Sequence, residues 1–257
     1  MNNKTALITG STSGIGLGIA TAFAKMGYNI VFNGLEADGP QIAQQVADEY
    51  SIQHLFFPAN VLDPEAIRNM VAAGVEKWAS IDILVNNAGI QFVSPVEDFP
   101  EAKWDTIIGI NLTAAFHATK AVWPGMKEKG WGRIINMASA HGLVASEFKS
   151  AYVASKHGLI GFTKTIALEG APFGITANAI CPGYVHTPIV ENQIGDQMKA
   201  HGYTRDEVIQ KVMLQKQAIK SFIPVEAIVE AARYMASEEA AQMTGIALPI
   251  DGGWTAQ

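Results

Sequence analysis

Short apolar runs alternate with amphipathic stretches along the whole chain. The runs are rich in Val, Ile and Phe and almost continuously apolar, as in strands whose two faces are both covered by helices. They are TALIT near residue 5, NIVFN near 29, HLFFP near 54, DILVN near 82, GRIINM near 132, ITANAI near 175 and GIALPI at the end. The stretches between them have helical spacing and predict helices over residues 15–26, 39–50, 64–78, 101–123, 150–169 and 225–236.

The alternation of strands and helices predicts parallel strands joined by crossover helices. We therefore expect an α/β fold, a doubly wound parallel sheet with helices on both faces. The 257 residues lie at the upper edge of what one hydrophobic core organises, so a single domain over residues 1–257 is expected.

One segment, about 186–221, interrupts this rhythm. It contains no strand pattern and two modest helical stretches, and it is much longer than the usual connection in such folds. Long insertions on a rigid scaffold often cover a site, which predicts a helical lid over the substrate. The alternative is a pair of surface helices that only extends the fold.

Composition excludes several classes of protein. Eighteen Lys and Arg residues face 24 Asp and Glu residues, giving a net charge of -6, and no basic block is available for a nucleic acid. No apolar run reaches the length of a membrane span. The N-terminal residues start a strand pattern instead of a signal peptide, and Cys181 is the only cysteine, so a reducing cytoplasm is expected. Cys181 itself fits a small buried apolar group better than a nucleophile. No residue spacing indicates a metal site.

A glycine-rich turn follows the first predicted strand. Gly10, Gly14 and Gly16 in GSTSGIG lie where the chain enters a helix. Glycines allow the backbone to approach a ligand, and the amide groups of the helix start favour a pyrophosphate. The spacing G-x-x-x-G-x-G differs from the most familiar dinucleotide motif, but its position after the first strand indicates a dinucleotide site.

The charges after the second predicted strand bear on which dinucleotide is bound. Glu36 and Asp38 follow this strand, Ser13 precedes Gly14, and no Arg or Lys occurs between residues 26 and 67. A 2′-phosphate would meet no cation there, whereas a carboxylate can accept a hydrogen bond from a ribose hydroxyl, so NAD is expected instead of NADP. The alternative, that both carboxylates are simply solvated, stays open.

A second group of polar residues predicts acid and base chemistry. Tyr152 and Lys156 are four positions apart and share one face of a helix, where an ammonium can lower the pKa of a phenol. Ser139, at the end of the fifth strand, can donate to an oxygen on which negative charge grows. Asn111, polar in an apolar helix, could hold a water that links Lys156 to solvent. Each also has a structural reading: a helix-interior hydrogen bond for Asn111, a cap for Ser139 and a surface pair for Tyr152 and Lys156.

Together these features resemble the short-chain dehydrogenase/reductase family over essentially the whole chain. The resemblance is carried by TGSTSGIG, NNAG at 86–89, Asn111, Ser139, YVASK and the PG at 182–183. It implies a Rossmann-type sheet, a nicotinamide cofactor, a catalytic set of Asn111, Ser139, Tyr152 and Lys156, and usually a homotetramer. One departure is Asn60, where the family often has aspartate.

The cofactor site expected on this basis runs along the carboxyl ends of the strands. Its residues are Gly10, Thr12, Ser13, Gly14, Ile15, Gly16, Leu35, Asn60, Val61, Asn87, Ala88, Gly89, Tyr152, Lys156, Pro182, Gly183, Val185 and Thr187.

Residues near the catalytic set indicate a substrate with a carboxylate. His141 and Lys149, two potential cations, lie between Ser139 and Tyr152, and the amides of Gln91 and Gln193 could converge with them. Taken singly, each of these residues is an ordinary solvated side chain.

Further stretches resemble the members of the family that oxidise 3-hydroxybutyrate: NNAGIQ, SAHGLVAS, KSAYVASKHG, NAICPG, TPIVENQI and DGGWTAQ. This resemblance implies that Gln91, His141, Lys149 and Gln193 bind the carboxylate of a 3-hydroxy acid next to Ser139 and Tyr152, with Trp254 near the pocket. Tyr184 stands where a bulky aromatic residue, plausibly tryptophan, is expected. The expected reaction is reversible, NAD-dependent oxidation of (R)-3-hydroxybutyrate to acetoacetate.

Two other functions use the same features. A 3-ketoacyl carrier reductase would have the same catalytic set but should prefer NADP and display a basic docking patch. A dinucleotide-sensing protein without turnover would not need both Tyr152 and Lys156.

Overall fold

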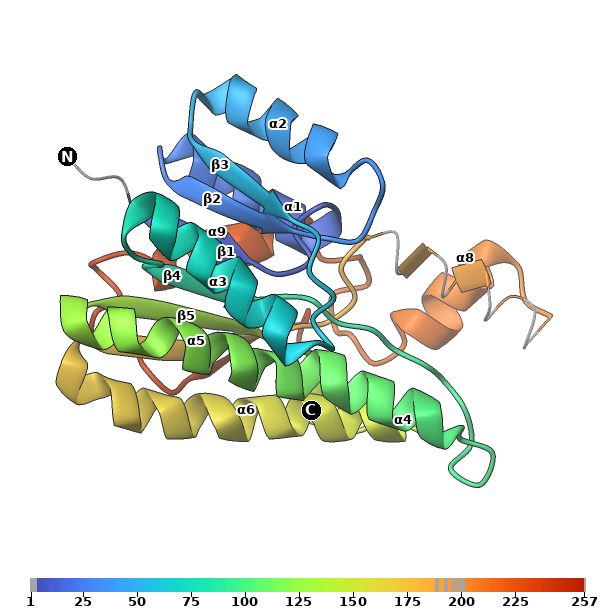
Figure 1. Cartoon of the computed structure of the whole chain (residues 1–257). Coiled ribbons are helices and arrows are strands. Elements are labelled where there is room, and N and C mark those ends of the chain that lie inside the picture. Colours follow the sequence, from blue (N-terminus) through green and yellow to red (C-terminus); the bar gives the residue numbers. More distant parts are fainter. Residues whose placement is uncertain (1–3, 188–189, 192–193, 196–197, 199–201, 257) are drawn as a thin grey trace.

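The computed structural model describes residues 4–187, 190–191, 194–195, 198 and 202–256 (Figure 1). Its strands are β1 (Thr5–Ile8), β2 (Asn29–Asn33), β3 (His54–Phe57), β4 (Ile83–Asn86), β5 (Gly132–Met137), β6 (Ile175–Pro182) and β7 (Ala247–Ile250). Its main helices are α1 (Gly14–Lys25), α2 (Gly39–Tyr50), α3 (Pro64–Trp78), α4 (Glu101–Ile108), α5 (Ala114–Lys129), α6 (Ser150–Gly170) and α9 (Val225–Met235).

The strands form one parallel sheet in the order β3-β2-β1-β4-β5-β6-β7. Every residue of β1, β2, β4, β5 and β6 is buried, whereas the edge strands β3 and β7 are only partly buried. This burial explains the continuous apolar runs, because both faces of an inner strand contact helices. The expected doubly wound α/β fold is therefore confirmed.

The helices cover the two faces of the sheet in two separate cores. Phe23 of α1, Val46 of α2 and Ile228 of α9 pack on one face, and Met70 of α3, Val122 of α5 and Ile166 of α6 pack on the other. In Figure 1, α3, α5 and α6 lie on the near side of the sheet and α1 and α9 lie behind it. The order of connections reverses between β1 and β4, and such a switch point opens a crevice at the carboxyl ends of the strands.

The helix expected over residues 101–123 differs from the prediction. It consists of α4, a π-helical turn η1 (Gly109–Thr113) and α5, which continues to Lys129 and ends at Gly130 in the left-handed conformation. A π-helical turn shifts the spacing of the side chains by only a fraction of a turn. The pattern of apolar residues is too coarse to show such a small shift. The other expected helices agree with the structure within two residues at each end.

The segment expected to form a lid is partly helical among its described residues. Its described part contains α8 (Arg205–Val208) and a π-helical turn η4 (Ile209–Met213), and α8 starts with a capping box between Thr204 and Glu207. Figure 1 shows α8 projecting to one side of the sheet. The action of this segment as a lid stays a prediction. None of the helices among the described residues is long and apolar enough to span a membrane.

Candidate active site

A cavity of about 460 Å³ opens at the carboxyl ends of the strands. Its lining begins at the glycine-rich turn after β1, passes the ends of β2, β3 and β4, and continues to Ser139, Tyr152 and Trp254. One continuous cleft therefore joins the predicted cofactor residues to the predicted catalytic residues.

The glycine-rich turn has backbone geometry that side chains would disturb. Gly10 and Gly14 have φ angles of +62° and +53°, a region that favours glycine. A Cβ on Gly16 would lie 2.1 Å from the carbonyl oxygen of Gly10. Helix α1 starts at Gly14, so its free amide groups face the cleft.

Two asparagines hold this turn in place. Asn87 Nδ2 donates to the carbonyl oxygens of Thr9 and Gly10 at 3.0 and 2.9 Å. Asn33 Oδ1 accepts from the amide of Gly10 at 3.2 Å, and its Nδ2 donates to the carbonyls of Phe57 and Ala59. Asn33 was not among the expected site residues. A signal for it was available, because a polar residue ends an otherwise apolar buried strand here, as Asn86 does at the end of β4.

Glu36 lies at the far end of the cleft from the catalytic residues. Thr12 Oγ1 donates to Glu36 Oε2 at 2.5 Å, and the amide of Leu35 donates to the same oxygen at 3.0 Å. The hydrogen bond from Thr12 is the main reason why the pKa of this carboxyl is lowered. The cleft thus has a hydrogen-bonded carboxylate at the end away from Ser139 and Tyr152.

The expected cofactor residues fall into two groups. Most of them line the cleft: Gly10, Ser13, Gly14, Ile15, Leu35, Asn60, Val61, Asn87, Ala88, Gly89, Tyr152, Lys156, Pro182, Gly183, Val185 and Thr187. Thr12 and Gly16 do not line it: Thr12 is buried and holds Glu36, and Gly16 packs against Gly10. Asp38 precedes α2 and also lies outside the lining.

Asn111 lies in the π-helical turn η1 and joins it to the loop after β4. Its Oδ1 accepts from the amide of Ile90 at 2.9 Å, and its Nδ2 donates to the carbonyl of Ile90 and to Ser155 Oγ at 3.0 and 3.1 Å. Its hydrogen bonds thus leave its own helix, and both the structural role and the catalytic role of Asn111 stay open. The side chain instead fixes the chain next to Gly89, where Lys156 Nζ also lies.

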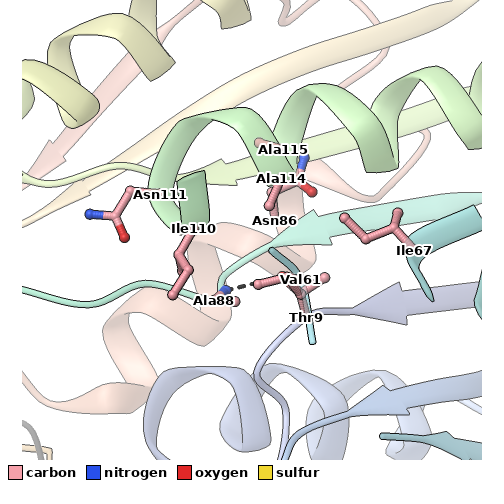
Figure 2. Close-up of a pocket in the computed structure, with 9 residues that line it drawn as sticks. All are labelled: Thr9, Val61, Ile67, Asn86, Ala88, Ile110, Asn111, Ala114 and Ala115. Carbon is pink, nitrogen blue, oxygen red and sulfur yellow. Dashed lines mark hydrogen bonds between the residues drawn. The ribbon is translucent and has the colours of Figure 1, made fainter. Parts of the chain in front are cut away.

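A cavity of about 10 Å³ lies beneath this turn, between β1, β4 and η1. It has the size of one water molecule. Figure 2 shows that the amide of Asn111 points away from Thr9, Val61 and Ile67, which line the other side. The cavity is therefore a small gap behind the cleft, and the Asn111 amide does not point into it.

Tyr152 and Lys156 project from the first turns of α6 toward Ser139 at the end of β5. Lys156 Nζ donates to the carbonyl of Met137 at 2.7 Å and lies 5.6 Å from the centre of the Tyr152 ring. Ser139 Oγ accepts from the amide of His141 at 3.2 Å. The structure thus brings Ser139, Tyr152 and Lys156 to one end of the cleft, and Asn111 lies behind its lining, near Gly89.

The pKa values at this end depend mainly on burial. Burial raises the pKa of Tyr152, and a hydrogen bond with Ser139 opposes this rise. Burial lowers the pKa of Lys156 to about 8. In the chain alone burial decides the pKa of Tyr152, and the lowering expected from Lys156 is not seen. Burial likewise raises the pKa of the nearby Cys181 thiol to about 11.

His141 is not the cation that the sequence predicts. Burial, followed by the positive charges of Lys149, Lys216 and His157, lowers its pKa to about 3, so the imidazole is neutral. Its Nε2 lies 3.0 Å from Ser146 Oγ and its Nδ1 lies 3.5 Å from Ser139 Oγ. The ring contacts Trp254 edge-on at 4.8 Å between centroids. His141 therefore positions Ser139 through neutral hydrogen bonds.

Lys149 is a buried cation at this end of the cleft. It is 8% exposed, and no carboxylate of a described residue lies within ion-pair distance of it. Burial and the charge of Lys216 lower its pKa to about 8. Lys216, in the long segment before α9, was missed because a lysine in an irregular segment has no sequence pattern that would place it there.

Gln91 has a side-chain donor without a partner at this end. Its Nε2 is buried and has no hydrogen-bond acceptor among the described residues. Gln91 and Lys149 both line the cleft with Tyr152 and Trp254, as expected. Gln193 lies outside the described residues. The described His, Cys, Asp and Glu residues form no group that could hold a metal ion.

Comparisons with known proteins agree with this geometry. The family model of the short chain dehydrogenases matches residues 4–198. The chain is 55% identical to a D-beta-hydroxybutyrate dehydrogenase of Rhizobium meliloti (strain 1021) over 99% of both chains. It is 48% identical to a D-beta-hydroxybutyrate dehydrogenase of Cupriavidus necator over the full length of both. Among solved structures, a variant of the actinorhodin polyketide ketoreductase with NADPH superimposes with a TM-score of 0.94 at 32% identity, covering 99% of this chain and 98% of that one.

Proposed function

Because the chain belongs to the short-chain dehydrogenase family, we propose that it oxidises (R)-3-hydroxybutyrate to acetoacetate with NAD, in a reversible reaction. The names of the two bacterial relatives support this substrate. The physical argument for it comes from the unsatisfied groups at the substrate end of the cleft.

The buried donors at this end carry the proposal. A buried lysine without a carboxylate and a buried amide without an acceptor are both unfavourable in an empty protein, and a carboxylate satisfies both. Lys149 and Gln91 line the same cleft as Ser139 and Tyr152, so a short acid bound by the first pair can present its hydroxyl to the second. Neutral His141 supports the position of Ser139.

The cleft fits a nicotinamide dinucleotide with a free ribose hydroxyl. The left-handed Gly10 and Gly14 and the start of α1 form a cradle for a pyrophosphate. Among the described lining residues, the only lysines are Lys149 and Lys156, both at the catalytic end, and there is no arginine. Glu36 lies at the other end, where its negative charge favours a hydroxyl over a phosphate. NAD, when bound, supplies the nicotinamide ring that accepts the hydride.

The four polar residues of the catalytic end would move the proton. The phenol oxygen of Tyr152 takes the proton of the substrate hydroxyl, and Ser139 Oγ holds the same oxygen while charge develops on it. The Lys156 ammonium stabilises the phenolate, which burial otherwise disfavours. Asn111 fixes the loop at Ile90 and Gly89, beside Lys156 Nζ.

Enantiomer selection follows from holding the substrate at two points. The carboxylate at Lys149 and Gln91 and the hydroxyl at Ser139 and Tyr152 fix the orientation of C3 between them. The single hydrogen on C3 then faces the cofactor in one enantiomer only.

Absorbance at the NADH band tests the proposal. Purified protein is mixed with D- or L-3-hydroxybutyrate and NAD or NADP. We expect NADH to form with the D acid and NAD only. Reduction of a 3-ketoacyl thioester with NADPH, together with no oxidation of the free acid, would show that the chain is a ketoacyl reductase instead.

Variants of the same assay separate the roles of the residues. Tyr152→Phe should abolish turnover and retain NADH binding. Lys149→Ala should raise KM for the acid by roughly one to two orders of magnitude, because a hydrogen bond to a charged group is lost. Lys25→Ala, which changes an exposed lysine at the end of α1, is the control and should behave as the wild type. An unchanged KM in Lys149→Ala would overturn the carboxylate assignment.

The chain is also proposed to assemble as a homotetramer in the cytoplasm. Large apolar side chains stay exposed on α4, α5 and α6, namely Trp104, Phe116 and Leu168, and a helical face of this kind favours association. The single cysteine, which is buried and excludes an intrachain disulfide, supports a reducing compartment.

A further inference from the structure

We propose that the hydroxyl of Tyr184 is a specificity-determining donor to the substrate carboxylate, held beside Lys149 by the ammonium itself. This inference rests on the proposed function and deepens it. Tyr184 follows β6 and lines the cleft with Lys149 and Trp254.

The backbone of Tyr184 is fixed on both sides. Its amide donates to Gln217 Oε1 at 3.1 Å, and its carbonyl accepts from the amide of Ile223 at 2.9 Å. Gln217 is fully buried and in turn donates to the carbonyls of Ile219 and Ser221. The position of the residue therefore does not depend on a ligand.

The ring of Tyr184 is fixed as well. It stacks on the ring of Trp254 with 5.6 Å between centroids and 9° between the planes. Trp254 in turn meets His141 edge-on, so both aromatic residues belong to one packed wall. A phenol held in this way loses little conformational entropy when it binds a ligand.

The direction of the hydrogen bond at Tyr184 carries the inference. Lys149 Nζ lies 3.4 Å from the phenol oxygen of Tyr184. An ammonium can only donate, so the phenol oxygen must accept, and its own proton remains available for another acceptor. No described residue accepts a hydrogen bond from this hydroxyl. Burial raises the pKa of Tyr184 to about 12, which keeps the group a neutral donor at physiological pH.

A carboxylate between these groups satisfies both of them. One oxygen can accept from the Lys149 ammonium and the other from the Tyr184 hydroxyl, while Gln91 Nε2 offers a third donor. A neutral ligand would leave the buried charge without a counter-ion, and an ester carbonyl is a weaker acceptor for the phenol proton than a carboxylate oxygen. Tyr184 thus favours acids over esters and simple alcohols, beyond its role as an apolar wall.

Tyr184→Phe tests this role, because it removes one oxygen and keeps the ring that stacks on Trp254. For (R)-3-hydroxybutyrate we expect KM to rise about tenfold or more with kcat nearly unchanged, since a contact made equally in the ground and transition states is lost. The methyl ester of the same acid, whose carbonyl is a weaker acceptor, should show a clearly smaller rise. Tyr234→Phe, at an exposed tyrosine of α9, is the matched control.

A binding measurement makes the test independent of turnover. Butanoate, a carboxylate without the reacting hydroxyl, is titrated into the NADH complex while the tryptophan fluorescence is followed. Its dissociation constant should rise by the same factor in Tyr184→Phe, with the affinity for NADH and the unfolding midpoint unchanged. If the wild type oxidises the acid and Tyr184→Phe keeps its KM and its butanoate affinity, the inference is wrong. If the wild type neither oxidises the acid nor binds butanoate, the proposed function itself is wrong.

Discussion

Lys149 shows how much of the proposed specificity depends on one buried charge. A buried ammonium that no described carboxylate balances has a lowered pKa, so its charge is easily lost. Glu36 is the opposite case, because hydrogen bonds from Thr12 and Leu35 keep it ionised at the other end of the cleft. Lys149 would select the substrate by its positive charge, and Glu36 would select the cofactor by its negative charge.

Carboxylate binding should weaken as the pH rises through about 8, the pKa of Lys149. The lysine is charged below this pH and neutral above it, so the inhibition constant of butanoate should rise about tenfold per pH unit at higher pH. Lys149→Gln should bind butanoate weakly, with a flat profile between pH 6 and 10. A flat profile in the wild type up to pH 10 would contradict the prediction. A slope that remains in Lys149→Gln would be assigned to Lys156, whose pKa is also about 8.

Glu36 should set the preference for NAD over NADP. Replacing it with alanine removes the negative charge that faces a 2′-phosphate, so the ratio of kcat/KM for NADP to that for NAD should rise at least about tenfold. Asp38→Ala is the matched control, because Asp38 lies outside the cleft and should leave the ratio unchanged. Equal ratios in Glu36→Ala and the wild type would show that the carboxylate is only solvated.

At the scale of elements, the turn between β1 and α1 is the part most sensitive to side chains. Gly16 has the carbonyl of Gly10 and the amide of Asn87 within 2.5 Å of the place where a Cβ would be. The neighbouring atoms belong to the backbone of the cradle and to the side chain that holds it, so they cannot move without changing the site.

Gly16→Ala should therefore lose NADH affinity by at least about tenfold and unfold at a lower temperature, since the added methyl group overlaps backbone. Gly125→Ala, inside α5, is the control: a Cβ there meets no atom within 4 Å. That variant should be stabilised by about 0.5–1 kcal/mol, the difference between glycine and alanine in a helix. Thermal unfolding and NADH titration of both variants check the prediction; equal effects would mean that the cradle tolerates a side chain.

Elements were predictable from the sequence where local patterns decide them. The apolar runs predicted the strands, and the helical spacing predicted α1, α2, α3, α6 and α9 closely. The π-helical turn at Asn111 was not predictable, because the Asn111 side chain bonds to Ile90, which lies in another loop of the chain. The neutral state of His141 was not predictable either, since its burial depends on Trp254, more than a hundred residues later.

At the scale of the whole molecule, the fold brings together residues from most of the chain. The switch point between β1 and β4 places the cradle, the loop with Gln91 and the start of α6 along one cleft. Helices α5 and α6, on the near side in Figure 1, leave the apolar side chains of Phe116 and Leu168 exposed. These surfaces are where association would stabilise the molecule.

Phe116→Glu should reduce the mass of the assembly. Phe116 lies on α5, is 45% exposed and meets Phe162 of α6 edge-on, so a carboxylate there would be buried against apolar groups in an assembly through this face. Light scattering after size-exclusion chromatography should show a tetramer for the wild type and a smaller species for the variant. Met26→Glu, at an exposed apolar residue at the end of α1 on the other face of the sheet, is the control and should stay tetrameric. A wild-type monomer would contradict the proposed assembly.

The thiol of Cys181 can report how often the sheet around it opens. The thiol lies in the fully buried strand β6, is 0% exposed and has a pKa raised to about 11, so a thiol reagent cannot react with it while the sheet is closed. Because no other cysteine exists in the sequence, each labelled chain records one event in which the sheet opened. The labelling rate, measured with and without NAD or butanoate, would therefore show how strongly each ligand keeps the sheet closed, without any engineered label.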